Sequence, residues 1–105
     1  MDDEQRTERG MAMRRDVLGD AHIKRAEANK TPFNADFHDL ATRYAWCEIW
    51  QRPGLDRRTR SFMTLSMLLA LNRDNEFVLH VRAALNNGLS RDEIKEVLLH
   101  SAIYC

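Results

Sequence analysis

Two ionisable side chains lie on apolar helical surfaces of the sequence, where they could transfer protons. His80 stands at the edge of an apolar stripe, with Glu76 one helical turn away. A carboxylate at that spacing would favour the protonated imidazole and fix its tautomer, which suits a general acid or base. Glu48 falls in the middle of another apolar stripe, where a carboxylate must be paired, hydrogen-bonded or protonated. Both residues also have a structural interpretation: His80 as a solvated or packed histidine, and Glu48 as the i, i+4 ion-pair partner of Arg52.

Arginines and aromatic residues supply possible binding groups. Three arginines, Arg57, Arg58 and Arg60, follow Asp56 and either present guanidinium groups to a dianion or form a solvated first helical turn. Trp46 and the neighbouring Trp50 favour packing, although either ring could contact a substrate.

The remaining histidines and the cysteines offer little sign of metal or dithiol chemistry. The spacing of His22, His38 and His100 suggests no metal site, and Cys47 and Cys105 form no Cys-x-x-Cys pair. Two free thiols are typical of a reducing compartment, so we expect a cytoplasmic protein.

Composition excludes several classes of protein. The 105 residues suffice for one domain, and 16 basic residues balance 16 acidic ones. A net charge of zero argues against nucleic acid or a membrane surface as the partner. The apolar run from Phe62 to Leu71 is much shorter than the roughly 20 residues that cross a bilayer, and the charged segment 1–9 resembles no secretory signal.

Helix-stop and helix-capping residues predict a chain of about five to six helices and no strand. Gly19 ends an amphipathic run over 4–18, and Thr31-Pro32 breaks the next segment. Asn34 can cap a helix over 34–51 that Arg52-Pro53-Gly54 ends, and Asp56 can cap a helix over 57–71. A helix over 74–87 is predicted to end before Gly88. The last helix begins at residue 91, after the capping box formed by Ser90 and Glu93. The fold class is therefore all-α, a helical bundle.

Two of these helices carry more apolar surface than a small monomer can bury. At 100° per residue, Phe37, Leu40 and Tyr44 form one stripe, with Trp46 and Trp50 on roughly the opposite side. The apolar side chains of segment 62–71 surround its helix almost completely. We therefore expect the chain to associate with further copies of itself. From the length of the chain, we expect residues 1–105 to form a single domain. Because the chain stops in an apolar helical phase, we also expect that this domain lacks a C-terminal segment.

The chain resembles the carboxymuconolactone decarboxylase family over essentially its whole length. The resemblance is carried by segments 43–61 and 80–97, and also by Arg9-Gly-Met and the run 14–22. The most specific stretches are Trp-x-Arg-Pro-Gly-Leu, which ends at Leu55, and His-x-Arg-Ala-Ala-x-Asn-Asn-Gly, which begins at His80. The wider alkylhydroperoxidase D-like superfamily is all-helical and oligomeric, so the resemblance implies a homo-oligomer, a hexamer or trimer of dimers. Redox members of that superfamily have a Cys-x-x-Cys pair ahead of the histidine, where this sequence has Arg73 and Glu76.

The resemblance implies an enzyme that decarboxylates 4-carboxymuconolactone to the 3-oxoadipate enol-lactone in protocatechuate breakdown, with no cofactor and no metal. It implies His80 as the proton donor or oxyanion partner and Glu48 as its orienting group or as the acid. Arg60, Arg73 and Arg43, in that order, would bind the substrate carboxylates. Trp50 would form an apolar wall. The alternatives are a peroxidase of the alkylhydroperoxidase D-like type that uses a lone thiol, and a helical assembly module with no activity.

Overall fold

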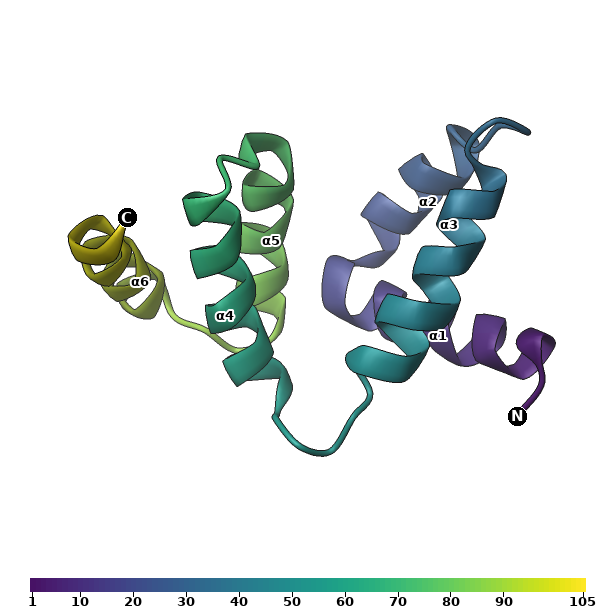
Figure 1. Cartoon of the computed structure of the whole chain (residues 1–105), viewed down its shortest axis with the longest axis horizontal. Coiled ribbons are helices and arrows are strands. Elements are labelled where there is room, and N and C mark those ends of the chain that lie inside the picture. The colour runs from purple at the N-terminus through teal and green to yellow at the C-terminus, as the bar shows by residue number, and fades with distance from the viewer. The chain divides into compact units, whose positions relative to one another are not determined.

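The computed structural model describes residues 1–105 and contains helices but no strand, which confirms the predicted all-α class. The elements are α1 (Asp3–Leu18), α2 (Asp20–Ala28), α3 (Ala35–Ala41), the π-helical segment η1 (Thr42–Ile49), α4 (Arg57–Ala70), α5 (Asp74–Asn86) and α6 (Arg91–Tyr104) (Figure 1). None of these helices has the length and hydropathy needed to cross a membrane. The chain divides into two compact units, Met1–Gly54 and Leu55–Cys105. That they form one domain stays a prediction.

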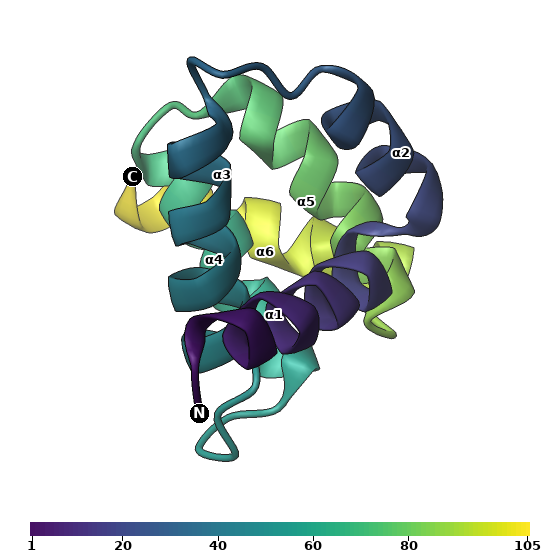
Figure 2. The ribbon, with the colours of Figure 1, turned by 90° about the vertical axis from the view of Figure 1, so that its right-hand side faces the viewer.

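The first unit is organised by the packing of α1 against η1. The α2 helix folds back onto α1, whereas α3 lies apart from α2 and is joined to it by segment 29–34 (Figure 2). Val17, Ile23 and Trp46 are buried in this unit, while α3 has no buried residue. Within the long helical segment 35–49, the buried apolar side chains therefore belong to η1.

A glycine allows α1 to approach η1 closely. Gly10 is buried, and a Cβ atom built on it would lie 2.1 Å from the carbonyl oxygen of Thr42. No side chain can occupy that space without moving one of the two backbones.

Most of the predicted helix ends are confirmed, with one change of role. Gly19 ends α1 with a φ of 92°, and α1 begins with an additional capping box formed by Asp2 and Gln5. Asn34 precedes α3 as predicted, but its side chain does not cap that helix. Its Oδ1 instead accepts a hydrogen bond from the Thr31 backbone N–H (2.7 Å), so it stabilises the preceding turn.

The predicted α-helical periodicity over 34–51 is wrong for its second half. From Thr42 to Ile49 the backbone is π-helical, and the Trp50 N–H then donates to the carbonyl of Ala45 five residues earlier (2.9 Å). Trp46 is buried, whereas Phe37, Leu40 and Tyr44 are 71%, 55% and 60% exposed. The stripe that contains Glu48 is therefore a surface stripe.

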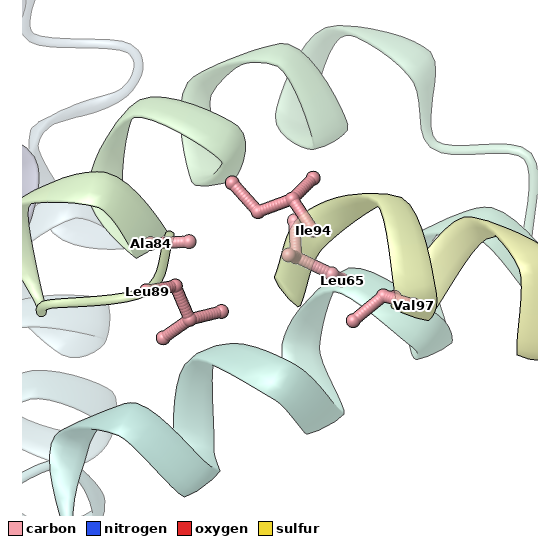
Figure 3. Close-up of a cluster of buried hydrophobic side chains, with 5 residues drawn as sticks. All are labelled: Leu65, Ala84, Leu89, Ile94 and Val97. Atoms are coloured by element: carbon pink, nitrogen blue, oxygen red, sulfur yellow. The ribbon is translucent and has the colours of Figure 1, made fainter. Parts of the chain in front are cut away.

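The second unit contains α4, α5 and α6, with α4 and α5 running side by side in opposite directions (Figure 1). Its core is a cluster of aliphatic side chains from all three helices and from the α5–α6 turn: Leu65, Ala84, Leu89, Ile94 and Val97 (Figure 3). The predicted Asp56 cap is confirmed by a hydrogen bond from the Thr59 N–H to Asp56 Oδ1 (2.7 Å). Gly88 follows α5 with a φ of 93°, as predicted for a residue just past a helix end.

The predicted capping box of α6 is also confirmed. Ser90 Oγ accepts from the Glu93 N–H (3.0 Å), and Glu93 Oε1 accepts from the Ser90 N–H (2.9 Å).

We expect Ser90→Ala to lower the free energy of unfolding by about 1 kcal/mol, because one N-terminal amide of α6 loses its acceptor. Urea unfolding followed by circular dichroism measures the change. Thr31→Ala removes an exposed hydroxyl that caps no helix and should change stability by less than about 0.5 kcal/mol; equal losses would contradict the prediction.

Candidate functional site

A hollow in the first unit contains two of the predicted site residues. It encloses about 300 Å³ and is lined by residues of α1, α3 and η1: Asp3, Arg6, Leu40, Arg43, Tyr44 and Glu48. Arg43 and Glu48 were predicted as a carboxylate-binding residue and an acid, so the structure brings these two together. Of the other four, Leu40 and Tyr44 were predicted only as members of an apolar stripe, and Asp3 and Arg6 were not singled out in the sequence.

The charges of this hollow are only partly neutralised within the chain. Arg6 and Asp3 form an ion pair of 3.2 Å one turn apart on α1. Glu48 is exposed and makes no ion pair with Arg52, so the structural interpretation of Glu48 as half of that pair is wrong. The expected desolvation of this carboxylate is wrong as well, because its apolar stripe faces outward. Arg43, half-buried, likewise forms no ion pair and is available to an anion.

The π-helical backbone explains why Arg43 and Glu48 share one hollow. Five residues separate them, which places two α-helical side chains about 140° apart, on different faces. In a π-helix the hydrogen bonds run from i to i+5, so residues five apart lie one above the other. This juxtaposition had no signal in an analysis that assumed 100° per residue.

Trp50 occupies the end of the same segment and packs on Trp46. The ring centroids are 5.2 Å apart and the planes are inclined by 23°, a stacked arrangement. One face of Trp50 is therefore used in packing, as the structural interpretation of the two tryptophans predicts.

The other predicted residues, His80, Arg60 and Arg73, belong to the second unit. His80 is half-buried on α5, within one turn of the buried Ala83 and Ala84. Glu76 is exposed and forms no hydrogen bond or ion pair with His80. The expectation that Glu76 orients this histidine is therefore wrong.

Arg60 and Arg73 lie at opposite ends of the α4–α5 pair. Arg73 directly precedes α5 and is exposed. Arg60, half-buried, adjoins Ser61, whose hydroxyl accepts from Asn87 Nδ2 (2.8 Å) at the far end of α5. At 1.5 Å per residue, His80 is about 10 Å along the helix axis from either end.

Arg58 has a structural role that the sequence left open. Its guanidinium group donates hydrogen bonds to the Gly88 carbonyl and to the Glu93 carboxylate. The guanidinium carbon, Cζ, lies 5.9 Å from the centre of the Phe62 ring. The hydrogen bond to Glu93 raises the pKa of Arg58 and lowers that of Glu93. Arg58 therefore ties α4 to the start of α6 and is not a free dianion-binding group.

Metal and thiol chemistry find little support in the geometry. No three His, Cys, Asp or Glu side chains converge where they could hold a metal ion. Cys47 is buried in the first unit, Cys105 is exposed in the second, and both thiols are free.

A second hollow, of about 380 Å³, lies between α4 and α6, where it is lined by Ser66, Glu96 and His100 together with Phe62 and Val97. The i, i+4 spacing of Glu96 and His100 was the one sequence signal for it.

Comparison with known proteins assigns this geometry to a family. Residues 35–105 match the model of the carboxymuconolactone decarboxylase family. The chain is 48% identical to the 4-carboxymuconolactone decarboxylase of Acinetobacter baylyi over 104 residues, 99% of this chain and 78% of the relative. It is 45% identical to the nitrosuccinic acid decarboxylase of Metarhizium robertsii over 91% of the chain and 67% of the relative. A 4-carboxymuconolactone decarboxylase of Pseudomonas putida is 47% identical over 43% of the chain and 94% of the relative.

Proposed function

The chain belongs to the carboxymuconolactone decarboxylase family, and we propose that it decarboxylates 4-carboxymuconolactone to the 3-oxoadipate enol-lactone in protocatechuate catabolism. The observation that carries the proposal is the 48% identity with the Acinetobacter enzyme across almost the entire chain. The segments that carry the resemblance, 43–61 and 80–97, contain Arg43, Glu48 and His80.

The chemistry of this substrate makes a cofactor unnecessary. The departing carboxylate sits on the γ carbon of an α,β-unsaturated lactone. When the bond to carbon dioxide breaks, its electron pair moves through the double bond onto the lactone carbonyl oxygen. The resulting furan-like oxyanion takes a proton at the α carbon to give the enol-lactone. The substrate therefore holds the electrons itself, and the protein needs to bind carboxylates, stabilise the oxyanion and deliver a proton.

Each of these tasks has a candidate residue. His80 is the proposed proton donor, since imidazole exchanges protons near neutral pH. Glu48 is the proposed second acid or orienting group, and its lack of an ion-pair partner leaves it available for that role. Arg60, Arg73 and Arg43 are the proposed carboxylate-binding groups, and Arg43 opens onto the same hollow as Glu48. Trp50, which stacks on Trp46, is the proposed apolar wall.

The two relatives that align with more than nine-tenths of this chain carry names with different substrates, and this difference defines the decisive assay. Nitrosuccinic acid, like the lactone, is a small dicarboxylic acid with an electron-withdrawing group, so both are candidates by charge and size. Purified protein is mixed with each compound, and loss of the lactone chromophore or release of carbon dioxide is followed. We expect turnover of the lactone with a kcat/KM at least tenfold above that for nitrosuccinic acid. The opposite preference, or no turnover of either, would overturn the proposal.

We also propose a cytoplasmic homo-oligomer, a hexamer or a trimer of dimers, that acts on a small-molecule dicarboxylate. Large apolar side chains exposed on both units support association, among them Phe37 and Leu40 on the first and Met67 and Leu71 on the second. The two free thiols suit a reducing compartment. Sedimentation velocity over a hundredfold range of protein concentration measures the number of copies, and a monomer throughout would contradict the assembly.

The peroxidase alternative is not favoured. Arg73 and Glu76 stand where redox members of the superfamily carry a thiol pair, and Cys47 is buried. Without a resolving thiol, a lone cysteine has no intramolecular partner to complete peroxide reduction. The relatives that the chain matches carry decarboxylase names.

A further inference from the structure

A further hollow lies in the second unit, between α5 and α6, and contains none of the residues proposed for the decarboxylation. It encloses about 400 Å³ and is lined by four aliphatic and two basic residues: Val81, Leu85, Arg91, Ile94, Lys95 and Leu98. Ligand sites in proteins commonly enclose roughly 300–1,000 Å³. The hollow therefore has the size of a site for a small molecule.

The aliphatic part of this hollow is built from residues of both helices. Ile94 belongs to the buried cluster of the second unit, and Val81 packs against that cluster. Leu85 and Leu98 also line the hollow and remain 45% and 43% exposed. Both α5 and α6 pack mainly on α4 rather than on each other, which leaves the hollow between them. It therefore offers an aliphatic surface to the hydrocarbon part of a ligand.

Two cations border this aliphatic surface. Arg91 and Lys95 are exposed and lie four residues apart, on the same face of α6 as Ile94 and Leu98. Neither of the two basic side chains forms an ion pair or a hydrogen bond with the chain. Both are therefore available to an anion in the hollow.

The acidic residues of α6 do not neutralise these two cations. Glu93 binds Arg58 and accepts a hydrogen bond from the Ser90 N–H. Glu96 lines the separate hollow between α4 and α6. Asp92 is exposed and forms no ion pair. The hollow thus combines an aliphatic surface with an excess of positive charge, and no carboxylate lines it.

We propose that this hollow binds a small monocarboxylate with an apolar body, such as an aryl or a medium-chain alkyl carboxylate. The apolar body covers the four aliphatic residues, and the carboxylate accepts hydrogen bonds from Arg91 and Lys95. An inorganic anion gains nothing from the aliphatic surface, and a neutral hydrocarbon gains nothing from the cations. The site goes beyond the decarboxylation proposed above, because it uses none of the residues assigned to that reaction.

Binding is tested on the full chain with 2-naphthoate, whose own fluorescence anisotropy rises when it binds a protein. The uncharged 2-naphthamide has nearly the same shape and is the reference. We expect 2-naphthoate to bind about tenfold more tightly than 2-naphthamide, because only the carboxylate interacts with the two cations. Raising sodium chloride from about 0.05 M to about 0.5 M should remove most of this difference, since exposed charges are screened by salt.

The contribution of the cations is isolated by removing both. The double variant Arg91→Gln, Lys95→Gln should bind 2-naphthoate about tenfold more weakly and should leave the Kd for 2-naphthamide unchanged. Both side chains are exposed, so the fold should tolerate the change. The matched control is the double variant Lys24→Gln, Arg82→Gln, which removes the same net charge at exposed positions outside the hollow. It should leave the Kd for 2-naphthoate within about twofold.

The contribution of the aliphatic surface is tested with Leu98→Gln. This variant should weaken the binding of both 2-naphthoate and 2-naphthamide by about threefold or more, because both lose apolar contact. Leu99→Gln is its control, since Leu99 is 56% exposed on the same helix and does not line the hollow. It should leave both Kd values unchanged.

Four results would overturn the proposal. Equal affinity for 2-naphthoate and 2-naphthamide would show that the cations take no part in binding. Equal losses in the two double variants would mean that 2-naphthoate responds only to net charge. A loss in Arg43→Gln in place of the Arg91 and Lys95 variant would put the ligand in the first unit. Absence of saturable binding, or binding that disappears as copies associate, would mean that the hollow takes no such ligand or is covered by another copy. None of these outcomes depends on whether the lactone is turned over.

Discussion

Replacing His80 with alanine is expected to lower the kcat for the lactone by about 10²–10⁴-fold, the usual contribution of a positioned proton donor. The loss should appear in kcat more than in KM, since proton delivery matters after the substrate is bound. The measurement is the initial rate of lactone loss by ultraviolet absorbance, with circular dichroism to show that the variant is folded. Unchanged turnover would remove His80 from the mechanism.

The matched control for this variant is His100→Ala. His100 is an exposed histidine of the same unit, with its ring centre 5.0 Å from that of Tyr104, and it has no proposed part in the reaction. Its replacement should leave kcat within twofold. Comparable losses in the two variants would mean that the effect of His80→Ala is a general structural one.

A third variant, Glu48→Gln, separates the two proposed roles of the carboxylate. If Glu48 is the acid, kcat should fall as far as in His80→Ala, because the amide cannot donate a proton of suitable acidity. If Glu48 instead orients His80, the variant should retain more activity and shift the pH profile of kcat. A variant with unaltered kcat and unaltered pH profile would show that Glu48 has neither role.

The second large effect is expected from Gly10→Ala, which should destabilise the protein by about 3 kcal/mol or more. The added Cβ would lie 2.1 Å from the Thr42 carbonyl oxygen and 2.9 Å from its carbonyl carbon, so α1 and η1 must separate. Helix propensity alone predicts the opposite sign, since alanine is favoured over glycine inside a helix by about 1 kcal/mol. The sign of the change in urea unfolding therefore decides whether the close contact exists.

Gly54→Ala is the control for this substitution. A Cβ at Gly54 would meet nothing within 4 Å, so we expect the free energy of unfolding to stay the same or rise by up to about 1 kcal/mol. A stabilising effect of both variants would contradict the packing of α1 on η1. Because η1 carries Arg43 and Glu48, a folded Gly10→Ala protein should also lose activity.

The helix ends were predictable from the sequence because their interactions are local. Ser90 and Glu93 exchange hydrogen bonds three residues apart, and Asp56 accepts from Thr59 at the same spacing. Gly88 adopts a backbone conformation that glycine alone enters without strain. These interactions form whenever the segment is helical, so residue type and spacing suffice to predict them. The family resemblance was equally a property of residue order, and the comparisons confirm it.

The arrangement of the site residues was decided by tertiary structure. Arg43 and Glu48 share a hollow because η1 is π-helical. No residue type in that segment predicts that its backbone differs from an α-helix, which turns by 100° per residue. Sequence alone thus determined most of the helices and their ends, since those depend on neighbours within a few residues, and it also determined the family. Packing between helices determined which charged groups meet and which are left unpaired, because that depends on contacts between residues distant along the chain.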